Sequence, residues 1–341
     1  MKIAVVASPV TPLRPAQLGG AQAFLCDLAA GLASRGHEVR LFCAEGSEVS
    51  GVDLVAVPAP RDAAAALVMP GGAERPPSPG VAAALGIMFE GIRRDGFDVV
   101  SQHAFDAPAF ALARDLPVLH TLHLPPIVRA VVAAASQVDP RRLATVSRAC
   151  RDAWRGAAVK VGELLPNGVE ETAVDVVPDG KALIAGRLSP EKGIEHAIAA
   201  ARLAGLRVRT AGAHYDPAYE VDLTGTEQLG SLTRLDLRAV MARSSVTICA
   251  VRWDEPFGMV AAEAQMAGCP VAAYRRGALP EVVEEGVSGF LAAPDDVVGL
   301  ARAIKRCLAL DRAAVRASAR RRLGLDAALG RYERALERAA R

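Results

Sequence analysis

Two loops in the second half of the chain hold the densest set of polar side chains that could do chemistry. The first, residues 186–193, reads Gly-Arg-Leu-Ser-Pro-Glu-Lys-Gly and lies between a strand predicted over 181–184 and a helix predicted over 194–204. Its glycines allow a tight backbone, and the amides at a helix N-terminus carry partial positive charge. Arg187 adds a guanidinium that can donate hydrogen bonds to two phosphate oxygens, and Lys192 adds a point charge. The loop favours a phosphate ligand, and a capped turn with surface charges is the plainer alternative.

The second loop follows a strand predicted over 246–251 and contains two carboxylates eight residues apart. Glu255 lies beside proline and glycine in the loop, whereas Glu263 falls on the first turns of a helix predicted over 260–267. They cannot share a helix face, so we expect them to reach different parts of one ligand. For Glu263 alone, a simple interaction with the helix dipole is the alternative.

Two histidines follow predicted strands directly. His103 comes after the strand over 98–102, and His123 comes after the strand over 118–122. In a parallel sheet, ligands bind beyond the carboxyl ends of the strands. We therefore expect both side chains to line a ligand site, whereas His120, inside its strand, is predicted to be packed in the core.

The composition excludes several classes of protein. The 341 residues are 51% hydrophobic and 23% charged, with a formal net charge of +2, which indicates a globular protein of two domains rather than a disordered chain. The six cysteines contain no C-x-x-C pair, so neither a zinc site nor a disulfide scaffold is indicated. No apolar run approaches 18 residues, and the first apolar run is broken by proline, as in a buried strand rather than a signal peptide. We expect a cytoplasmic protein.

The charge is unevenly distributed along the chain. Residues 301–341 contain eleven arginines and one lysine against four carboxylates, a net charge of +8. The spacings Arg316/Arg320 and Arg334/Arg338 are typical of solvated helix faces. An anionic membrane surface is the alternative partner for this region, and no nucleic-acid partner is expected.

Short apolar runs alternate with helix-length segments in both halves, which predicts an α/β fold with two doubly wound parallel sheets. We expect domains over 1–165 and 166–325, facing across a cleft, with a final helix near 326–341 crossing back to the first. Further strands are predicted over 3–7, 37–43, 54–58, 142–147, 207–211 and 271–274, and further helices over 21–35, 81–94, 107–113, 234–243, 300–308 and 327–340. The loops 70–80 and 125–139 carry no recognisable signature. No G-x-x-x-x-G-K-[ST] or G-x-G-x-x-G motif is present, which disfavours P-loop ATPases and ordinary NAD dehydrogenases.

The order of these motifs resembles that of the retaining glycosyltransferases of family 4, which have the GT-B fold. The matching segments are Gly19-Gly20, the 186–193 loop, Glu255-Pro256-Phe257-Gly258 with Glu263, and the runs 120–123, 145–147, 166–169, 267–271, 280–283 and 286–291. The resemblance is closest between residues 181 and 294. The compact length is similar to that of small actinobacterial enzymes that decorate specialised metabolites.

The resemblance implies a role for each matching residue of the second domain. Arg187 and Lys192 would hold the diphosphate of a nucleotide-sugar donor, in the loop that Gly186 begins. Glu263 would accept hydrogen bonds from the ribose, and Glu255 would bind hydroxyls of the transferred sugar.

Further site residues are implied around these. Amides of Phe257, Gly258, Met259 and Val260 would complete the sugar and phosphate site. From the first domain, Gly19 and Gly20 would close over the diphosphate and His123 would lie near the reacting bond, with His103 as a further candidate.

The implied reaction is transfer of a hexose-type sugar from a nucleoside diphosphate, with UDP preferred to GDP or dTDP, to a hydroxyl group with retention of configuration. No cofactor and no metal would be needed, because Arg187 and Lys192 take the place of a divalent ion. The departing phosphate would deprotonate the acceptor, so Glu255 is interpreted as a binding group and not as a nucleophile. The alternatives are a related epimerase or phosphorylase, a sugar-nucleotide-binding subunit, and a membrane-associated lipid glycosyltransferase.

Two departures from the family pattern stand out. Residues 249–252 read Cys-Ala-Val-Arg where many relatives have Pro-Ser, and the role of Arg252 is unexplained by the pattern. The stretch 212–230 is short for the family, which leaves the nucleobase open. Neither the acceptor nor the oligomeric state is indicated by the sequence.

Overall fold

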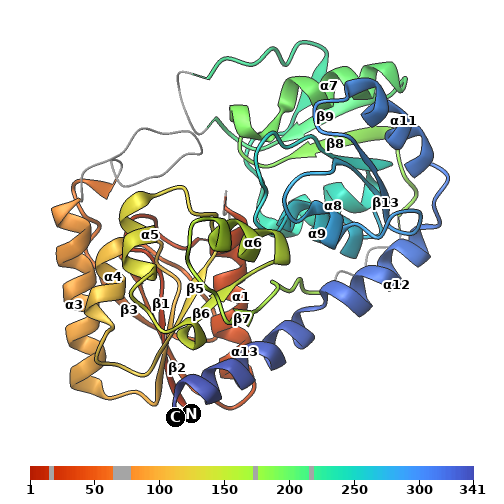
Figure 1. Cartoon of the computed structure of the whole chain (residues 1–341). Coiled ribbons are helices and arrows are strands. Elements are labelled where there is room, and N and C mark those ends of the chain that lie inside the picture. Colours follow the sequence, from red (N-terminus) through yellow and green to blue (C-terminus); the bar gives the residue numbers. More distant parts are fainter. Residues whose placement is uncertain (15–18, 64–77, 172–175, 215–218) are drawn as a thin grey trace. The chain divides into compact units, whose positions relative to one another are not determined.

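The computed structural model describes residues 1–14, 19–63, 78–171, 176–214 and 219–341. The chain divides into two compact units (Figure 1). Unit 1 comprises Met1–Pro15, Ala21–Pro166 and Asp326–Arg341, and unit 2 comprises Ala16–Gly20 and Asn167–Leu325. Each unit contains one parallel sheet, so the predicted α/β class with two doubly wound sheets is confirmed.

In its described part, unit 1 has a seven-stranded sheet in the order β3-β2-β1-β4-β5-β6-β7. The strands are β1 (Lys2–Val6), β2 (Glu38–Ala44), β3 (Asp53–Val57), β4 (Val99–Gln102), β5 (Val118–Leu122), β6 (Leu143–Thr145) and β7 (Glu163–Leu164). The chain adds strands on one side of β1 and then, from β4 onward, on the other. This switch between β1 and β4 is where doubly wound sheets bind ligands.

Helices cover both faces of this sheet. They are α1 (Gly20–Ser34), α3 (Pro79–Asp95), α4 (Ala107–Leu112), α5 (Arg129–Ala135), α6 (Arg148–Gly156) and α13 (Leu325–Ala339), with a 3-10 turn at Pro140–Arg142. Helices α3, α4 and α5 lie side by side in Figure 1. The core under α3 includes Leu85, Met88 and Phe89, whose spacing places them on one helix face.

The last helix, α13, packs on unit 1 beside α1. Tyr332 is fully buried, with its ring centroid 5.6 Å from that of Phe24 on α1. Arg35, just after α1, forms ion pairs with Asp326 and Glu333. The carboxyl-terminal helix is therefore fixed both by an aromatic contact and by a bridging guanidinium.

The described part of unit 2 has a six-stranded parallel sheet in the order β10-β9-β8-β11-β12-β13. Its strands are β8 (Lys181–Ala185), β9 (Arg207–Ala211), β10 (Thr226–Gln228), β11 (Val246–Cys249), β12 (Val271–Tyr274) and β13 (Gly289–Ala292). Its helices are α7 (Ile194–Leu203), α8 (Arg234–Arg243), α9 (Met259–Met266), α10 (Leu279–Val282), α11 (Val297–Cys307) and α12 (Arg312–Leu323), with a 3-10 turn at Pro190–Lys192. The direction of strand addition reverses between β8 and β11, so the loops that follow these two strands are neighbours.

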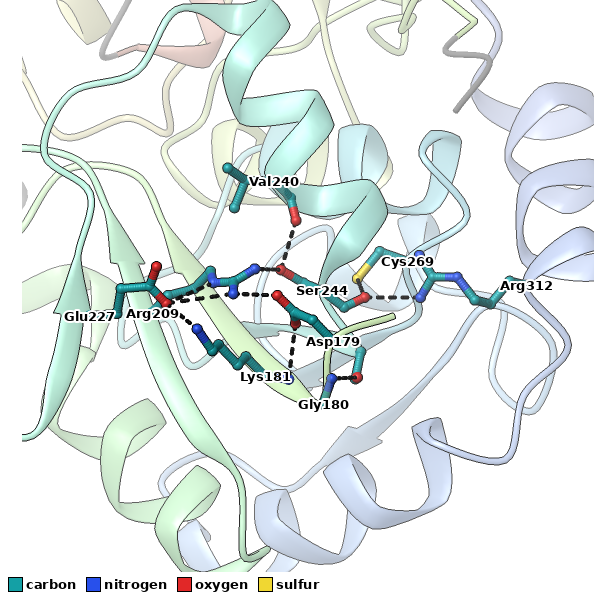
Figure 2. A network of polar contacts seen from close by, with 10 residues as sticks. Asp179, Gly180, Lys181, Arg209, Glu227, Val240, Ser244, Cys269 and Arg312 are labelled. Atoms are coloured by element: carbon teal, nitrogen blue, oxygen red, sulfur yellow. Dashed lines mark hydrogen bonds and ion pairs between the residues drawn. The ribbon is translucent and has the colours of Figure 1, made fainter. Parts of the chain in front are cut away.

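A charge network around one buried arginine lies on the opposite, amino-terminal side of this sheet (Figure 2). The Arg209 side chain is only 2% exposed and pairs with Asp179 and with Glu227. Lys181 donates to the same Glu227 at 2.7 Å, and Arg209 also reaches the Ser244 hydroxyl at 3.5 Å. Because each buried charge has an opposite partner, the network links β8, β9 and β10 without leaving an unpaired arginine.

The segment 125–139, which the sequence analysis treats as a loop, contains a helix. Helix α5 occupies Arg129–Ala135 within it. Its alanines favour a helix, but seven residues between flanking prolines are too few for a clear periodic pattern. Residues 70–77 of the predicted 70–80 loop lie outside the described residues, as do residues 215–218 of the stretch 212–230.

Several short elements were also absent from the prediction. The strands β7, β10 and β13 have two to four residues, and α10 has four. Such lengths give too few positions for a pattern of period 2 or 3.6. The basic pairs Arg316/Arg320 and Arg334/Arg338 lie on helices α12 and α13, as the spacing predicted. Within the described ranges, no helix combines the length and hydrophobicity that a membrane crossing requires.

Candidate active site

The loop after β8 is held tightly against the loop after β11. Gly193 has φ +61°, and a Cβ there would lie 2.0 Å from the carbonyl oxygen of Ala250. At the other end of the loop, Gly186 has φ +117° and donates its amide to Ala211 at 2.9 Å. These positions need glycine because the backbone is left-handed and, at Gly193, another backbone approaches closely.

Arg187 is oriented by a carboxylate of its own loop. Its Nη2 lies 3.3 Å from Oε1 of Glu191, and the Ser189 hydroxyl donates to the same oxygen at 2.6 Å. The Glu191 side chain is 7% exposed, and its backbone carbonyl accepts from the amide of Arg252 at 2.8 Å. Glu191 was not predicted as a site residue, although an acidic residue between two cations in a glycine-bounded loop could have indicated its role.

Lys192 and Glu255 meet across the two loops. The Lys192 ammonium donates to Oε2 of Glu255 at 2.8 Å, and the indole N–H of Trp253 donates to the same oxygen at 2.9 Å. The ammonium also lies 5.4 Å from the centre of the Trp253 ring, within the range of a cation–π interaction. The lysine and glutamate side chains are 20% and 13% exposed. The two predicted residues therefore form one fixed, largely buried pair.

The backbone of Glu255 is clamped by the loop after β12. The amide of Ala278 donates to the Glu255 carbonyl at 2.8 Å. A Cβ on Gly277 would lie 2.3 Å from that carbonyl oxygen. Only a glycine lets this loop approach so closely, and the approach fixes the height at which Glu255 projects from the carboxyl end of β11.

The predicted residues Phe257, Gly258, Met259 and Val260 form the entry to α9. Gly258, with φ +98°, is the residue before the helix, so the first-turn amides have no acceptor within α9. A Cβ on Gly186 would be 4.0 Å from Cγ2 of Val260, which places the loop after β8 beside this helix start. An anion held by Arg187 or Lys192 would therefore also lie close to the positive end of α9.

Glu263 lies one turn into α9 and is 8% exposed. Its Oε1 is 3.4 Å from Nη2 of Arg234, the first residue of α8. This carboxylate is mostly buried and paired with a guanidinium, so it does more than interact with the helix dipole; its hydrogen bonds to a ribose stay a prediction. Arg234 was missed, and no signal in the sequence relates it to a residue twenty-nine positions away.

In unit 1, both predicted histidines lie at the carboxyl ends of their strands and contact each other. Nδ1 of His103, after β4, is 2.8 Å from Nε2 of His123, after β5. The Ser101 hydroxyl is 2.8 Å from Nε2 of His103. Burial lowers the pKa of His123 to about 4 and lowers that of His103 well below its usual value, so both rings are neutral near pH 7.

His120 is a packed residue, as predicted. Its ring stacks on Phe110 with centroids 4.6 Å apart, and Nδ1 bonds to Oε1 of Gln102 at 3.1 Å. Burial, with a smaller contribution from Arg142, lowers its pKa to about 3. The ring therefore stays neutral and fills the space between β5 and α4.

Two further positions lie near the start of α1 and the start of α4. Gly20 is the first residue of α1 and Gly19 precedes it; their closure over a diphosphate stays a prediction. Asp106, at the start of α4, was missed: it accepts from the Ser8 hydroxyl at 2.8 Å, and burial raises its pKa. The pair lies after β1 and β4, at the switch in strand order.

Arg252, unexplained by the family pattern, has a structural partner. Its Nε lies 3.2 Å from Oδ1 of Asp295, and Arg276 pairs with the other oxygen of that carboxylate. Arg276 also donates to the Arg252 carbonyl at 3.1 Å. Arg252 therefore fixes the loop after β11 to the loop after β13.

Comparison with known families matches both halves of the chain. A family model described as "Glycosyl transferases group 1" matches residues 177–323, and one described as "Glycosyltransferase Family 4" matches residues 18–172. The chain belongs to the family 4 glycosyltransferases. The matches cover the loops that hold Arg187, Lys192, Glu255 and Glu263, as well as the segment with both histidines.

Three curated relatives illustrate the range of this family. The glycogen synthase of Mycobacterium tuberculosis is 37% identical over 158 residues, which are 42% of this chain and 38% of that protein. This chain thus spans less than half of the length of that relative. The D-inositol 3-phosphate glycosyltransferase of Mycolicibacterium smegmatis is 27% identical over 98% of this chain and 90% of its own length. The 2-deoxystreptamine glucosyltransferase of Streptomyces kanamyceticus is 33% identical over 45% of this chain and 46% of its own.

Solved structures share the fold over the full chain. AviGT4, a glycosyltransferase involved in avilamycin A biosynthesis, superimposes with a TM-score of 0.74 at 24% identity, covering 99% of this chain and 98% of that one. HepE of Anabaena, in complex with UDP and glucose, gives a TM-score of 0.73 at 19% identity, covering 99% of each chain. The fold of this glycosyltransferase is therefore the GT-B fold, as the sequence predicted.

Proposed function

We propose that this glycosyltransferase moves a hexose-type sugar from a UDP-linked donor to a hydroxyl of a small-molecule or glycan acceptor, with retention of configuration and without a metal ion. The observation that carries the proposal is the convergence of Arg187, Lys192 and Glu255 at the neighbouring carboxyl ends of β8 and β11, beside the α9 N-terminus. Unit 2 binds the donor, and unit 1 binds the acceptor. The complexes of HepE with UDP and with UDP-glucose support this choice of donor.

The diphosphate of the donor is bound by fixed positive charge. Arg187 and Lys192 are each oriented by a carboxylate, Glu191 and Glu255, before any ligand enters. Such preorganised charges cost little reorganisation when negative charge develops on the leaving diphosphate, so they stabilise the transition state more than the ground state. They supply the charge that a divalent ion supplies in metal-dependent transferases.

Glu255 and Glu263, the two predicted carboxylates, bind different parts of the donor. Both hydrogen bonds to Glu255 use Oε2, and no described residue bonds to Oε1, which leaves this oxygen for hydroxyls of the transferred sugar. Glu263 of α9, which is held by Arg234 of α8, accepts hydrogen bonds from the ribose hydroxyls. Retention follows if the departing phosphate takes the proton of the acceptor hydroxyl on the face that it leaves.

On the acceptor side, His123 contributes a neutral ring near the reacting bond. Its low pKa, caused by burial, means that the ring does not add positive charge near an oxocarbenium-like sugar. AviGT4, which is involved in avilamycin A biosynthesis, and the 2-deoxystreptamine glucosyltransferase support a specialised metabolite as acceptor.

Ligand binding and product analysis test the proposal. Thermal unfolding with UDP, GDP and dTDP should show the largest increase in Tm with UDP, because a ligand stabilises by RT ln(1 + [L]/Kd). Incubation with UDP-hexoses and an alcohol acceptor should give a glycoside whose anomeric configuration, read by NMR, equals that of the donor, and EDTA should leave the rate unchanged. The absence of any nucleoside diphosphate effect on Tm would refute the donor assignment. Formation of an epimer or of a sugar phosphate would instead identify the protein as an epimerase or a phosphorylase.

A further inference from the structure

Three buried polar side chains of unit 1 form one continuous hydrogen-bonded chain. Ser101 Oγ lies 2.8 Å from Nε2 of His103, and Nδ1 of His103 lies 2.8 Å from Nε2 of His123. Ser101 has no exposed surface, and each histidine is 7% exposed. Both rings are neutral, so each carries a single N–H and the protons along the chain must be ordered.

The two ends of this hydrogen-bonded chain differ in their position and in which atom is left without a partner. At one end, the Ser101 hydroxyl is fully enclosed and has no other hydrogen-bond partner within the described ranges. At the other end, Nδ1 of His123 is without a partner among the described residues. His123 lies just after the carboxyl end of β5, the edge at which parallel sheets bind ligands. Nδ1 of His123 is buried as well, but it lies at this edge of the sheet and still has no partner among the described residues.

Two proton orders satisfy the inner bonds. In the first, the Ser101 hydroxyl donates to His103 Nε2, His103 Nδ1–H donates to His123 Nε2, and His123 presents an N–H at Nδ1. In the second, every bond is reversed, so His123 presents a lone pair at Nδ1. The second order leaves the enclosed Ser101 O–H without an acceptor among the described residues, and a buried donor without a partner is destabilising. The first order leaves unpaired only the His123 N–H, which a ligand oxygen can accept.

We propose that Ser101 and His103 are positioning residues that hold His123 in the Nδ1–H tautomer, so that His123 donates a hydrogen bond to an oxygen of the acceptor bound by unit 1. In this role His123 is not a general base, because the only nitrogen that faces the ligand already carries a proton. The inference rests on the proposed function for the identity of that oxygen, but the tautomer itself does not.

Aromatic packing fixes the orientation of the two histidine rings. The Tyr332 ring of α13 stacks on His103 with centroids 6.0 Å apart, and Phe24 of α1 lies 6.3 Å from His123. These contacts hold both ring planes, so that a change in proton order at Ser101 is transmitted to His123 and not absorbed by ring rotation.

Nitrogen-15 NMR of the histidine rings tests the proposal directly on the full chain. In the wild type, with and without UDP, His123 should show a protonated Nδ1 and an unprotonated Nε2. Ser101→Thr keeps the hydroxyl and should keep this pattern. Ser101→Asp replaces the donor by an acceptor, so it should reverse the chain and move the proton of His123 to Nε2. A wild-type proton on Nε2, or an unchanged pattern in a folded Ser101→Asp protein, would overturn the proposal. If Ser101→Asp does not fold, the wild-type tautomer decides alone.

Steady-state kinetics of the same two variants provide a second test of the proposal. Ser101→Asp should lower kcat at least about tenfold with little change in the KM of the UDP-sugar, because it offers the ligand oxygen a lone pair in place of a donor. Ser101→Thr should retain wild-type kcat, and equal losses in both variants would contradict the positioning role. If the protein transfers no sugar at all, the proposed function fails, whereas the NMR result still tests the tautomer.

Discussion

Replacement of Lys192 by alanine removes the ammonium that joins the two loops of unit 2. The wild-type ammonium donates to Glu255 at 2.8 Å. After the substitution, Glu255 keeps the indole N–H of Trp253 at 2.9 Å. Because the carboxylate retains this partner and is partly exposed, the loss of folding stability should not exceed about 1–3 kcal/mol. The variant should therefore fold, and its defect can be measured as catalysis.

The effect on turnover follows from the charge that develops on the leaving group. As the sugar departs, the diphosphate gains about one negative charge. At roughly 4 Å and an effective dielectric constant of about 20, an ammonium attracts one such charge by about 4 kcal/mol. Loss of about 3–4 kcal/mol of transition-state stabilisation lowers kcat by about 10²–10³. The KM of the donor should change much less, because the ground-state charge is also held by Arg187 and the α9 amides.

The assay is single-turnover transfer from saturating UDP-sugar, with the donor KM measured in parallel. Lys305→Ala is the matched control, since Lys305 is an exposed lysine of α11 in the same unit. It should keep wild-type kcat. Lys192→Arg keeps the charge and should recover part of the lost rate. A Lys192→Ala variant that folds and keeps kcat within about threefold of wild type would refute the assignment of Lys192 to the diphosphate.

Three further predictions concern donor affinity and stability. Glu263→Gln should raise the donor KM by about tenfold or more with a smaller effect on kcat, since it weakens a charged hydrogen bond to the ribose; an unchanged KM would exclude that role. Arg35→Ala removes the bridge to Asp326 and Glu333 and should lower Tm by about 2–4 °C in calorimetry, whereas an unchanged Tm would mean that aromatic packing alone fixes α13. Burial lowers the pKa of His120 to about 3 and of His123 to about 4, so as pH falls the unfolded chain takes up these protons first. The free energy of unfolding, from urea titrations, should fall between about pH 6.5 and 4 by up to about 1.4 kcal/mol per pH unit for each histidine; a rise would contradict the burial of the rings.

The donor loops were predictable because their signals are local. A short apolar run predicts each strand, and a glycine-bounded segment followed by a helix predicts the turn that holds Arg187 and Lys192. The same reasoning placed Glu255 in a loop and Glu263 on a helix, as the structure has them. Helix α5 was not predicted for the opposite reason. Its seven residues pack against α4 and share a core with Leu122 of β5, and so short a segment shows no period of its own.

The partners of these residues could not be read from the sequence. Arg234 contacts the predicted site residue Glu263, yet nothing in the sequence says which carboxylate this guanidinium will meet. Ion pairs between distant residues depend on side chains from separate elements converging, and that convergence is a property of the sheet order. The same holds for Arg252, which pairs with Asp295 forty-three positions later.

By itself, the sequence determined the α/β class, the family and the loops in which the chemistry lies, since periodicity, glycine positions and motif order are properties of neighbouring residues. Only the tertiary structure decided that Lys192 meets Glu255, because the order of the sheet places β8 beside β11 although sixty-three residues separate the two side chains. It likewise joined Ser101, His103 and His123 through the pairing of β4 with β5. Strand order reflects the packing of the whole unit, and no local pattern specifies it.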